Sequence, residues 1–338
     1  MQSMPHRRQA AAVRAAGALP VVVARRLTGP APDRGAGPLE PDLALLLRLV
    51  GRLRWPDLER MSAPAAHAES RREAAVLAGR RLRADVRALQ LPGPAGPLAG
   101  RLYAAGGDSL VVWLHGGGWV LGDHDTHDAL YRRLARASGA SVLAVDYRRA
   151  PSAPFPAAAD DAVAAVRWAH AHAAELGADP LRIGVGGDSA GGNLAAVAAL
   201  ALRDAVAFQV LLYPVTDVSR EHPSYAEFED GPWLTAGLMR WFRAHYLPDA
   251  AAARDPRVSP LLAPDVAGVP PAYVGIAGHD PLRDEGLAYG RRLEQAGNEV
   301  LLDVLPAQLH GYAELAGVSR SARAATARAA RWIRARHQ

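Results

Sequence analysis

The sequence predicts an α/β fold in which helices cover both faces of a mostly parallel sheet. Eight apolar runs have the length and residue types of strands, and the later ones alternate with helical patterns. The first three runs follow one another without helices, so the sheet is expected to begin with antiparallel strands. The 338 residues, 50% of them hydrophobic, suffice for the core of one large domain.

The individual elements follow from residue type and spacing. Strands are expected where short apolar runs end at turn residues, and helices where apolar residues recur every three or four positions. The expected strands cover 84–91, 99–103, 109–114, 141–147, 181–185, 207–213, 272–276 and 299–305. The expected helices among them cover 128–138, 157–175, 190–203, 283–297 and 322–336. Together they make a main domain over residues 84–338, built on an eight-stranded sheet.

The flanking segments differ in composition from this main domain. Residues 1–38 are rich in Ala, Arg, Gly and Pro, and we expect a flexible arm there. Residues 39–83 contain two helical patterns, at 39–53 and 69–82, and residues 215–250 hold many aromatic side chains but no strand pattern. We expect 39–83 and 215–250 to form a helical cap over the strand ends. An ordinary crossover with one long helix is the alternative for 215–250.

Two residue types are missing, and their absence excludes several chemistries. Without cysteine there are no disulfides, thiolate nucleophiles, iron–sulfur clusters or cysteine zinc sites. All 39 basic residues are arginine, which excludes Schiff-base enzymes, pyridoxal-phosphate enzymes and a Walker-type phosphate loop. The net charge of +5 is spread over interleaved arginines and acids, so no nucleic-acid partner is expected.

The location of the protein is predicted from its apolar runs. No run of 18 apolar residues occurs, so we expect no stable membrane insertion. Arg7 and Arg8 would suit a twin-arginine export signal, but the apolar run at 18–24 is short and is closed by Arg25 and Arg26. A cytoplasmic location is therefore expected, and the sequence leaves a homodimer open.

The strongest motif is Gly-Asp-Ser-Ala-Gly at 187–191, which follows an expected strand and opens an expected helix. In that context Gly-x-Ser-x-Gly is typical of a nucleophile elbow, a tight turn that holds a serine hydroxyl at the carboxyl end of the sheet. Side chains at 187 and 191 would collide with neighbouring backbone. Ser189 is therefore the candidate nucleophile, and we predict that Asp188 beside it contacts the substrate.

A second motif, His-Gly-Gly-Gly-Trp at 115–119, follows another expected strand. Consecutive glycines can aim successive N–H groups at one point, which is what a developing oxyanion needs. Together with the residue after the nucleophile, the predicted donors are Gly116, Gly117 and Ala190. We predict that Trp119 contacts the substrate. A phosphate-binding loop is the alternative, but the chain has no lysine for it.

A serine nucleophile needs a base for its proton and a carboxylate that orients the base. His310 comes just after the last expected strand, and Asp280 comes shortly after the strand before it, so these two are the preferred base and acid. Asp284 and Glu285 are better explained as first-turn acids of a helix. The other histidines after Ser189 lie in the expected cap, beside Asp280 or at the chain end: His222, His245, His279 and His337.

These motifs resemble the bacterial hormone-sensitive-lipase family (family IV) of carboxylesterases, a branch of the α/β-hydrolase superfamily. The resemblance runs from about residue 85 to the C-terminus and rests on 115–119, 146–148, 187–193, 213–214, 259–261, 280–286 and 310–311. It implies an α/β-hydrolase fold with a helical cap and a triad of Ser189, Asp280 and His310. It also implies that a small-molecule ester with a short- to medium-chain acyl group is hydrolysed through an acyl-enzyme, without a cofactor.

Some alternatives remain open at this point. A natural-product deacetylase, a lactonase or an amidase would use the same machinery, and a non-catalytic binding protein would use the same fold. A metal site is suggested by the residue types and close spacing of His124, Asp125, His127 and Asp128. A helix N-terminus capped by Thr126 or Asp128 explains this segment without an ion, so no metal is predicted.

Overall fold

The computed structural model describes residues 6–28, 37–53 and 55–336. Its centre is an eight-stranded sheet with the order β1-β2-β4-β3-β5-β6-β7-β8. β1 (Asp85–Gly93) and β2 (Gly96–Ala104) form an antiparallel hairpin, and β2 is also antiparallel to β4. The other pairs are parallel. The predicted fold class is confirmed, including the antiparallel start of the sheet.

The remaining strands are β3 (Leu110–Leu114), β4 (Ser141–Asp146), β5 (Ile183–Asp188), β6 (Gln209–Leu212), β7 (Ala272–His279) and β8 (Val300–Leu309). Every residue of β3, β5, β6 and β7 is buried, which explains their mostly apolar sequences. Successive side chains point to opposite faces, so Val111 and Trp113 enter one core and Val112 and Leu114 the other. Each face of the sheet is thus apolar and has to be covered.

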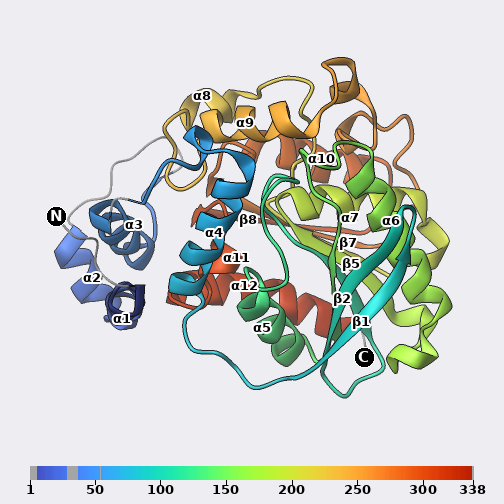
Figure 1. The fold of residues 1–338 in the computed structure, drawn as a ribbon, viewed down its shortest axis with the longest axis horizontal. Coiled ribbons are helices and arrows are strands. Elements are labelled where there is room, and N and C mark those ends of the chain that lie inside the picture. The colour runs from blue at the N-terminus through green and yellow to red at the C-terminus, as the bar shows by residue number, and fades with distance from the viewer. Residues whose placement is uncertain (1–5, 29–36, 54, 337–338) are drawn as a thin grey trace.

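Helices cover both faces. α6 (Ala157–Ala171), α7 (Ala190–Ala201) and α10 (Arg283–Gln295) supply one core, and α5 (Asp128–Ser138) and α12 (Arg320–Ala335) supply the other. Figure 1 shows α6 and α7 to the right of the sheet and α5 and α12 below it. α12 begins where the Ser319 hydroxyl accepts a hydrogen bond from the Ala322 N–H, and α5 ends at Gly139 in the left-handed region.

The N-terminal segment departs from the flexible arm expected over 1–38, because the structure has two helices there, α1 (His6–Ala18) and α2 (Val21–Thr28). Residues 1–5 and 29–36 lie outside the described residues. Val13 of α1 is fully buried, and a Cβ on Gly17 would lie 1.5 Å from the Val318 carbonyl oxygen. The small residues that suggested an arm therefore let α1 pack closely against the main domain.

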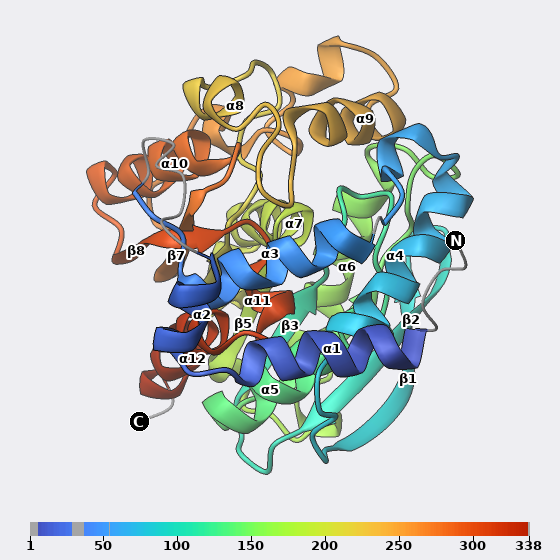
Figure 2. The ribbon, with the colours of Figure 1, turned by 90° about the vertical axis from the view of Figure 1, so that its left-hand side faces the viewer.

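Two further helices, α3 (Pro41–Leu53) and α4 (Ala63–Leu77), agree with the predicted pair, although α4 starts and ends earlier than the predicted 69–82. α4 starts early because Pro64 suits a first helical turn. Figure 2 shows α1 and α3 side by side, with α4 at their right-hand end. The Asp42 carboxylate of α3 accepts hydrogen bonds at the start of α12, from the hydroxyl groups of Ser319 and Ser321 and from the N–H groups of Arg320 and Ser321.

Residues 215–250 contain α8 (Pro223–Glu227) and α9 (Ala236–Tyr246) and no strand, so the predicted insertion has two helices rather than one. Figures 1 and 2 both show α8 and α9 along the top of the molecule. α11 (Tyr312–Leu315) is a single turn after β8. Short 3-10 turns complete the described elements: η1 (Leu58–Arg60), η2 (Ala174–Leu176), η3 (Pro180–Arg182), η4 (Arg203–Ala205), η5 (Ala251–Arg254) and η6 (Pro260–Leu262).

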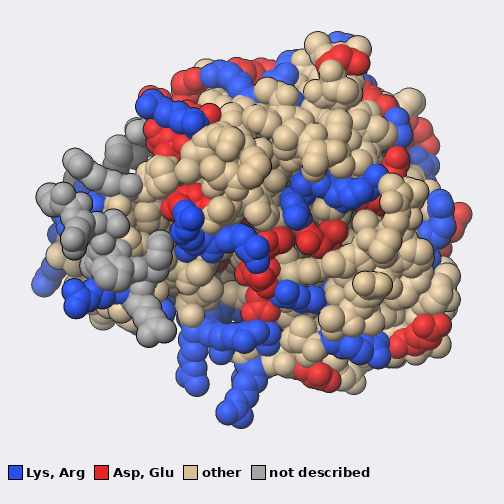
Figure 3. Space-filling model, in the orientation of Figure 1, with Lys and Arg blue, Asp and Glu red and all other residues tan. Residues whose placement is uncertain are grey.

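The surface carries charges of both signs. Figure 3 shows acidic side chains among the arginines on the face that it draws, in agreement with their interleaving along the sequence. Many of these side chains are paired; Arg240 of α9, for example, contacts both Glu221 and Glu229. Among the described residues, no helix has the length and apolar character needed to cross a membrane.

Candidate active site

Ser189 lies in the turn between β5 and α7, with φ +56° and ψ −120°. A non-glycine residue with positive φ is strained, and such strain is concentrated at functional sites. The neighbouring glycines permit the turn: a Cβ on Gly187 would lie 2.2 Å from the Gly191 carbonyl oxygen, and one on Gly191 would lie 2.0 Å from that of Leu114. The geometry is that of the predicted elbow, with the serine at the carboxyl end of β5.

A chain of hydrogen bonds joins three of the predicted residues across separate strands. The Ser189 Oγ lies 3.0 Å from His310 Nε2, and His310 Nδ1 lies 2.8 Å from Asp280 Oδ2. The second carboxylate oxygen, Asp280 Oδ1, accepts a hydrogen bond of 2.8 Å from the Leu282 N–H. Asp280 is only 1% exposed, so its carboxylate is held in one orientation. This arrangement can pass a proton from a serine hydroxyl to an oriented imidazole.

The other candidate acids, Asp284 and Glu285, and the neighbouring histidine, His279, have contacts outside the Ser189–His310–Asp280 chain. Asp284 accepts a hydrogen bond from the Ser224 N–H and pairs with Arg283. Glu285 is buried and accepts from the N–H groups of residues 216 and 217. Both acids lie in the first turn of α10, as predicted. The ring of His279 faces Phe228, with 5.8 Å between the ring centroids.

The glycine loop after β3 has the backbone freedom that its sequence predicts. Gly117 and Gly118 have φ of +111° and +59°, in the region that favours glycine. Within the described residues, the N–H groups of Gly116, Gly117 and Ala190 donate to no other group, so they are available to an oxyanion. Gly117 lines the pocket over Ser189, and Gly116 and Ala190 are buried residues that are not among those lining it.

The two predicted substrate contacts, Trp119 and Asp188, are not among the residues that line the pocket. Trp119 also has positive φ, +60°, which turns its indole into the core, where it stacks on Tyr246 with 4.3 Å between the ring centroids. The Asp188 carboxylate is fully buried and accepts hydrogen bonds from Trp113 Nε1 at 3.0 Å and from His127 Nε2 at 3.2 Å.

His127 and Asp188 form a buried ion pair. Burial alone would lower the pKa of His127, but the negative charges of Asp188 and Glu314 raise it to about 9. Burial would raise the pKa of Asp188, but the charge and hydrogen bond of His127 hold it below its usual value. One ligand-type atom of each of these three residues lies within 4.8 Å of the others, and the ion pair between His127 and Asp188 lies within this cluster.

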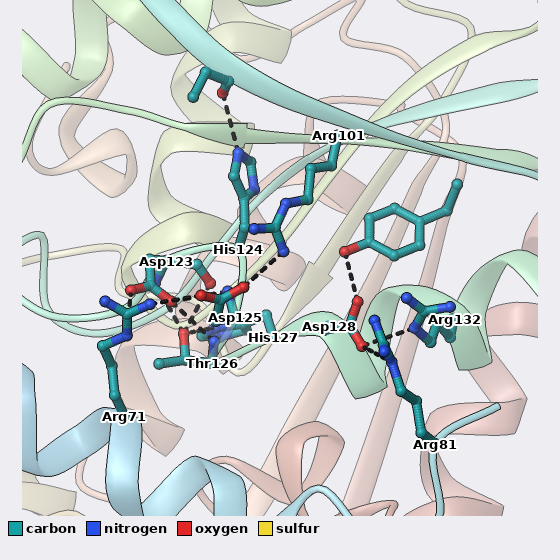
Figure 4. A network of polar contacts seen from close by, with 12 residues as sticks. Arg71, Arg81, Arg101, Asp123, His124, Asp125, Thr126, His127, Asp128 and Arg132 are labelled. Atoms are coloured by element: carbon teal, nitrogen blue, oxygen red, sulfur yellow. Dashed lines mark hydrogen bonds and ion pairs between the residues drawn. The ribbon is translucent and has the colours of Figure 1, made fainter. Parts of the chain in front are cut away.

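The other residues of the segment that suggested a metal site are engaged separately, as Figure 4 shows. Asp125 pairs with Arg71 and Arg101, and Asp128 accepts a hydrogen bond of 2.7 Å from Arg132 Nε. His124 Nε2 lies 3.2 Å from the Ala99 carbonyl oxygen. The predicted helix cap also needs correction. α5 has no side-chain cap, and the turn before it is closed by Asp123, which accepts from the N–H groups of residues 125 and 126.

A cavity of about 530 Å³ opens over Ser189 and His310. Its walls come from both segments that the sequence analysis assigned to a cap and from the glycine loop. From the N-terminal segment they include Leu47, Val50, Trp55, Leu58, Glu73 and Leu77; from residues 215–250 they include Trp233, Leu234, Leu238 and Phe242. Sequence reasoning missed Glu73 and Glu314, and it named His127 only as part of the suggested metal site. The position of Glu314, one helical turn after His310, was the only available signal for either of the two acids.

With this fold and site, the chain belongs to the α/β-hydrolase family, in its hormone-sensitive-lipase-like branch, because the family model described as the alpha/beta hydrolase fold matches residues 111–314. It is similar to the carboxylic ester hydrolase LipN of Mycobacterium tuberculosis, with 44% identity over 82% of this chain and 77% of that protein. It is also similar to an ethyl acetate hydrolase of Pseudomonas putida, with 40% identity over 83% of this chain and 93% of the relative.

Among solved structures, an ester hydrolase from the metagenome of Lake Arreo, in complex with a bipyridine phosphonate derivative, superposes with a TM-score of 0.84. The two chains are 38% identical, and the match covers 88% of this chain and 98% of the other. The predictions that the chain is an enzyme and a carboxylic ester hydrolase are confirmed by these relatives.

Proposed function

We propose that the chain is a serine carboxylesterase that acts through Ser189, Asp280 and His310 on esters with short to medium acyl chains. The observation that carries this proposal is the hydrogen-bond chain from Ser189 Oγ through both nitrogens of His310 to Asp280, at the floor of a cavity. The three side chains leave the sheet at β5, β7 and β8, so a rigid scaffold sets their spacing.

The reaction follows from this geometry. His310 Nε2 takes the proton of Ser189 as its Oγ attacks the ester carbonyl carbon, and the N–H groups of Gly116, Gly117 and Ala190 stabilise the oxyanion. When the tetrahedral intermediate collapses, His310 gives the proton to the leaving alcohol, and an acyl-enzyme remains. Water then attacks the acyl group, His310 takes a proton from that water, and the proton returns to Ser189 as the acid departs. Asp280 keeps the proton of the free imidazole on Nδ1.

The limit on chain length rests on the cap. Residues 39–83 and 215–250 supply most of the wall over Ser189, and a cavity of about 530 Å³ has a finite acyl slot. Each methylene contributes about 0.8 kcal/mol while it fits, and it costs strain once the slot is full. The similarity to an ethyl acetate hydrolase supports short substrates.

Covalent labelling tests the nucleophile. A phosphonate ester probe should modify a single serine, and mass spectrometry should place it at Ser189. Ser189→Ala should fold normally and lose about three to six orders of magnitude in kcat. Ser152→Ala, at an exposed serine that donates only to the Arg149 carbonyl, is the matched control and should keep full activity and labelling. Labelling of another residue, or an active Ser189→Ala, would overturn the assignment.

A further inference from the structure

The wall of the active-site cavity is acidic, although the chain as a whole is basic. Four carboxylates line it, those of Asp57, Glu59, Glu73 and Glu314. Among the described residues no arginine lines it, although the chain contains 39, and the His127 imidazole at its wall is paired with Asp188. A cavity of this composition repels anionic ligands and attracts cationic ones.

Glu73 and Glu314 are the two half-buried carboxylates of this wall, whereas Asp57 and Glu59 are exposed. Glu73 of α4 has no hydrogen-bond or ion-pair partner among the described residues. Glu314 of α11 follows His310 by one helical turn, and its side chain is 34% exposed. Its Oε1 lies 3.9 Å from His127 Nε2, but that nitrogen is closer to Asp188, at 3.2 Å. Both carboxylates therefore have spare capacity for a positive group.

Aromatic side chains stand next to these acids. Trp55 and Trp233 line the cavity and meet edge to face, with 6.2 Å between their ring centroids. Trp233 has φ +82°, a strained conformation for a bulky residue, of the kind that is concentrated at functional sites. A Cβ placed on Gly311 would lie 3.2 Å from Trp233 Nε1 and 3.8 Å from Glu314 Oε1, so the indole and the carboxylate flank the residue that follows His310.

Aromatic faces combined with carboxylates are the usual environment for a quaternary ammonium group. We propose that this cavity selects esters that carry a cationic ammonium group, held between Glu73, Glu314 and the indoles of Trp55 and Trp233. The inference rests on the proposed function, because it names the substrate class of the same site. An anionic ester would be repelled by the same carboxylates, and so would the acid product after hydrolysis, which favours its release.

The protonation of Glu73 makes the preference depend on pH. Burial raises the pKa of Glu73 to about 8, assisted by the negative charges of Glu69 on the same helix and of Glu314 on α11. Burial also raises the pKa of Glu314, against the positive charge of His127. Glu73 is therefore largely neutral at pH 6.5 and charged at pH 9. The preference for a cation should increase over that range, because only the charged form attracts it strongly.

A matched pair of substrates tests the inference. Butyrylcholine and 3,3-dimethylbutyl butyrate have the same shape and differ only in a charged nitrogen in place of a carbon. We expect the ratio of their kcat/KM values to favour the cation by about tenfold at pH 9 and by less at pH 6.5. Any effect of pH on the catalytic step that the two esters share acts on both rates, so it cancels from the ratio. Tetramethylammonium should also inhibit hydrolysis of the neutral ester competitively.

Variants locate the effect. Glu73→Gln should lower the ratio of kcat/KM values at pH 9 and remove most of its pH dependence. Adding Glu314→Gln to this variant should lower the ratio further. Glu294→Gln, at an exposed acid of α10 that does not line the cavity, is the control and should leave both rates unchanged. Hydrolysis of the neutral ester with a ratio of one or less overturns this inference and leaves the proposed function intact. If neither ester nor p-nitrophenyl butyrate is hydrolysed, the proposed function fails and the inference with it.

Discussion

Asp280→Asn is expected to lower kcat by about four orders of magnitude while the fold is retained. One carboxylate oxygen, Oδ1, accepts the Leu282 N–H at 2.8 Å, and this buried donor requires an oxygen there in the variant as well. The amide nitrogen of the asparagine must then occupy the place of Oδ2, 2.8 Å from His310 Nδ1. Because that nitrogen is a donor, His310 Nδ1 becomes an acceptor and its proton moves to Nε2. Nε2 can then no longer take the proton of Ser189, and losses near 10⁴-fold accompany this tautomer in serine triads.

The assay is steady-state hydrolysis of p-nitrophenyl butyrate by the wild type, Asp280→Asn and Asp284→Asn. Asp284 accepts from the Ser224 N–H and pairs with Arg283, away from His310, so its variant should stay within a few-fold of the wild type. Circular dichroism and the unfolding midpoint show whether each variant is folded. A folded Asp280→Asn within tenfold of wild-type kcat, or an inactive Asp284→Asn, would refute the argument from the Leu282 hydrogen bond.

Three further expectations concern chain length, stability and metals. Across p-nitrophenyl esters of graded length, kcat/KM should rise by up to roughly fourfold per methylene, peak at short to medium chains and then fall; a preference for long-chain emulsions would contradict the enclosed slot. Burial raises the pKa of Asp42, but hydrogen bonds from Ser321, Ser319 and Arg320 outweigh it and hold the pKa below its usual value. Asp42→Ala should therefore reduce the free energy of unfolding by about 1–2 kcal/mol at pH 7. In denaturant titrations this difference should begin to shrink as the pH falls below about 4, the ordinary pKa of an aspartate in the unfolded chain, and it should be lost below the lower pKa of Asp42 in the folded state. Prolonged EDTA treatment should leave ester hydrolysis unchanged; activity that is lost and then restored by Zn²⁺ would support a metal at 124–128.

The features that sequence analysis predicted best depend on neighbours in the chain. The strand before Ser189 and the glycines at 187 and 191 are local requirements of one tight turn, so the elbow is readable from consecutive residues. The sheet was predictable for a similar reason, because strands buried on both faces must be apolar almost throughout. His310 and Asp280 could be assigned because parallel strands bring their carboxyl ends to the same edge.

Only the tertiary structure decided which remote residues make contact and in which directions side chains point. α1 docks where Gly17 lies against Val318, which is remote from it in the chain, so composition alone indicated a flexible arm over 1–38. Trp119 follows the glycine loop, yet its positive φ turns the indole away from the cavity. Glu73 looks like any solvent-facing helix acid in the sequence. It becomes a half-buried carboxylate near Glu314, without a hydrogen-bond or ion-pair partner among the described residues, only because α4 packs over the site. The folding of the whole chain determines that packing.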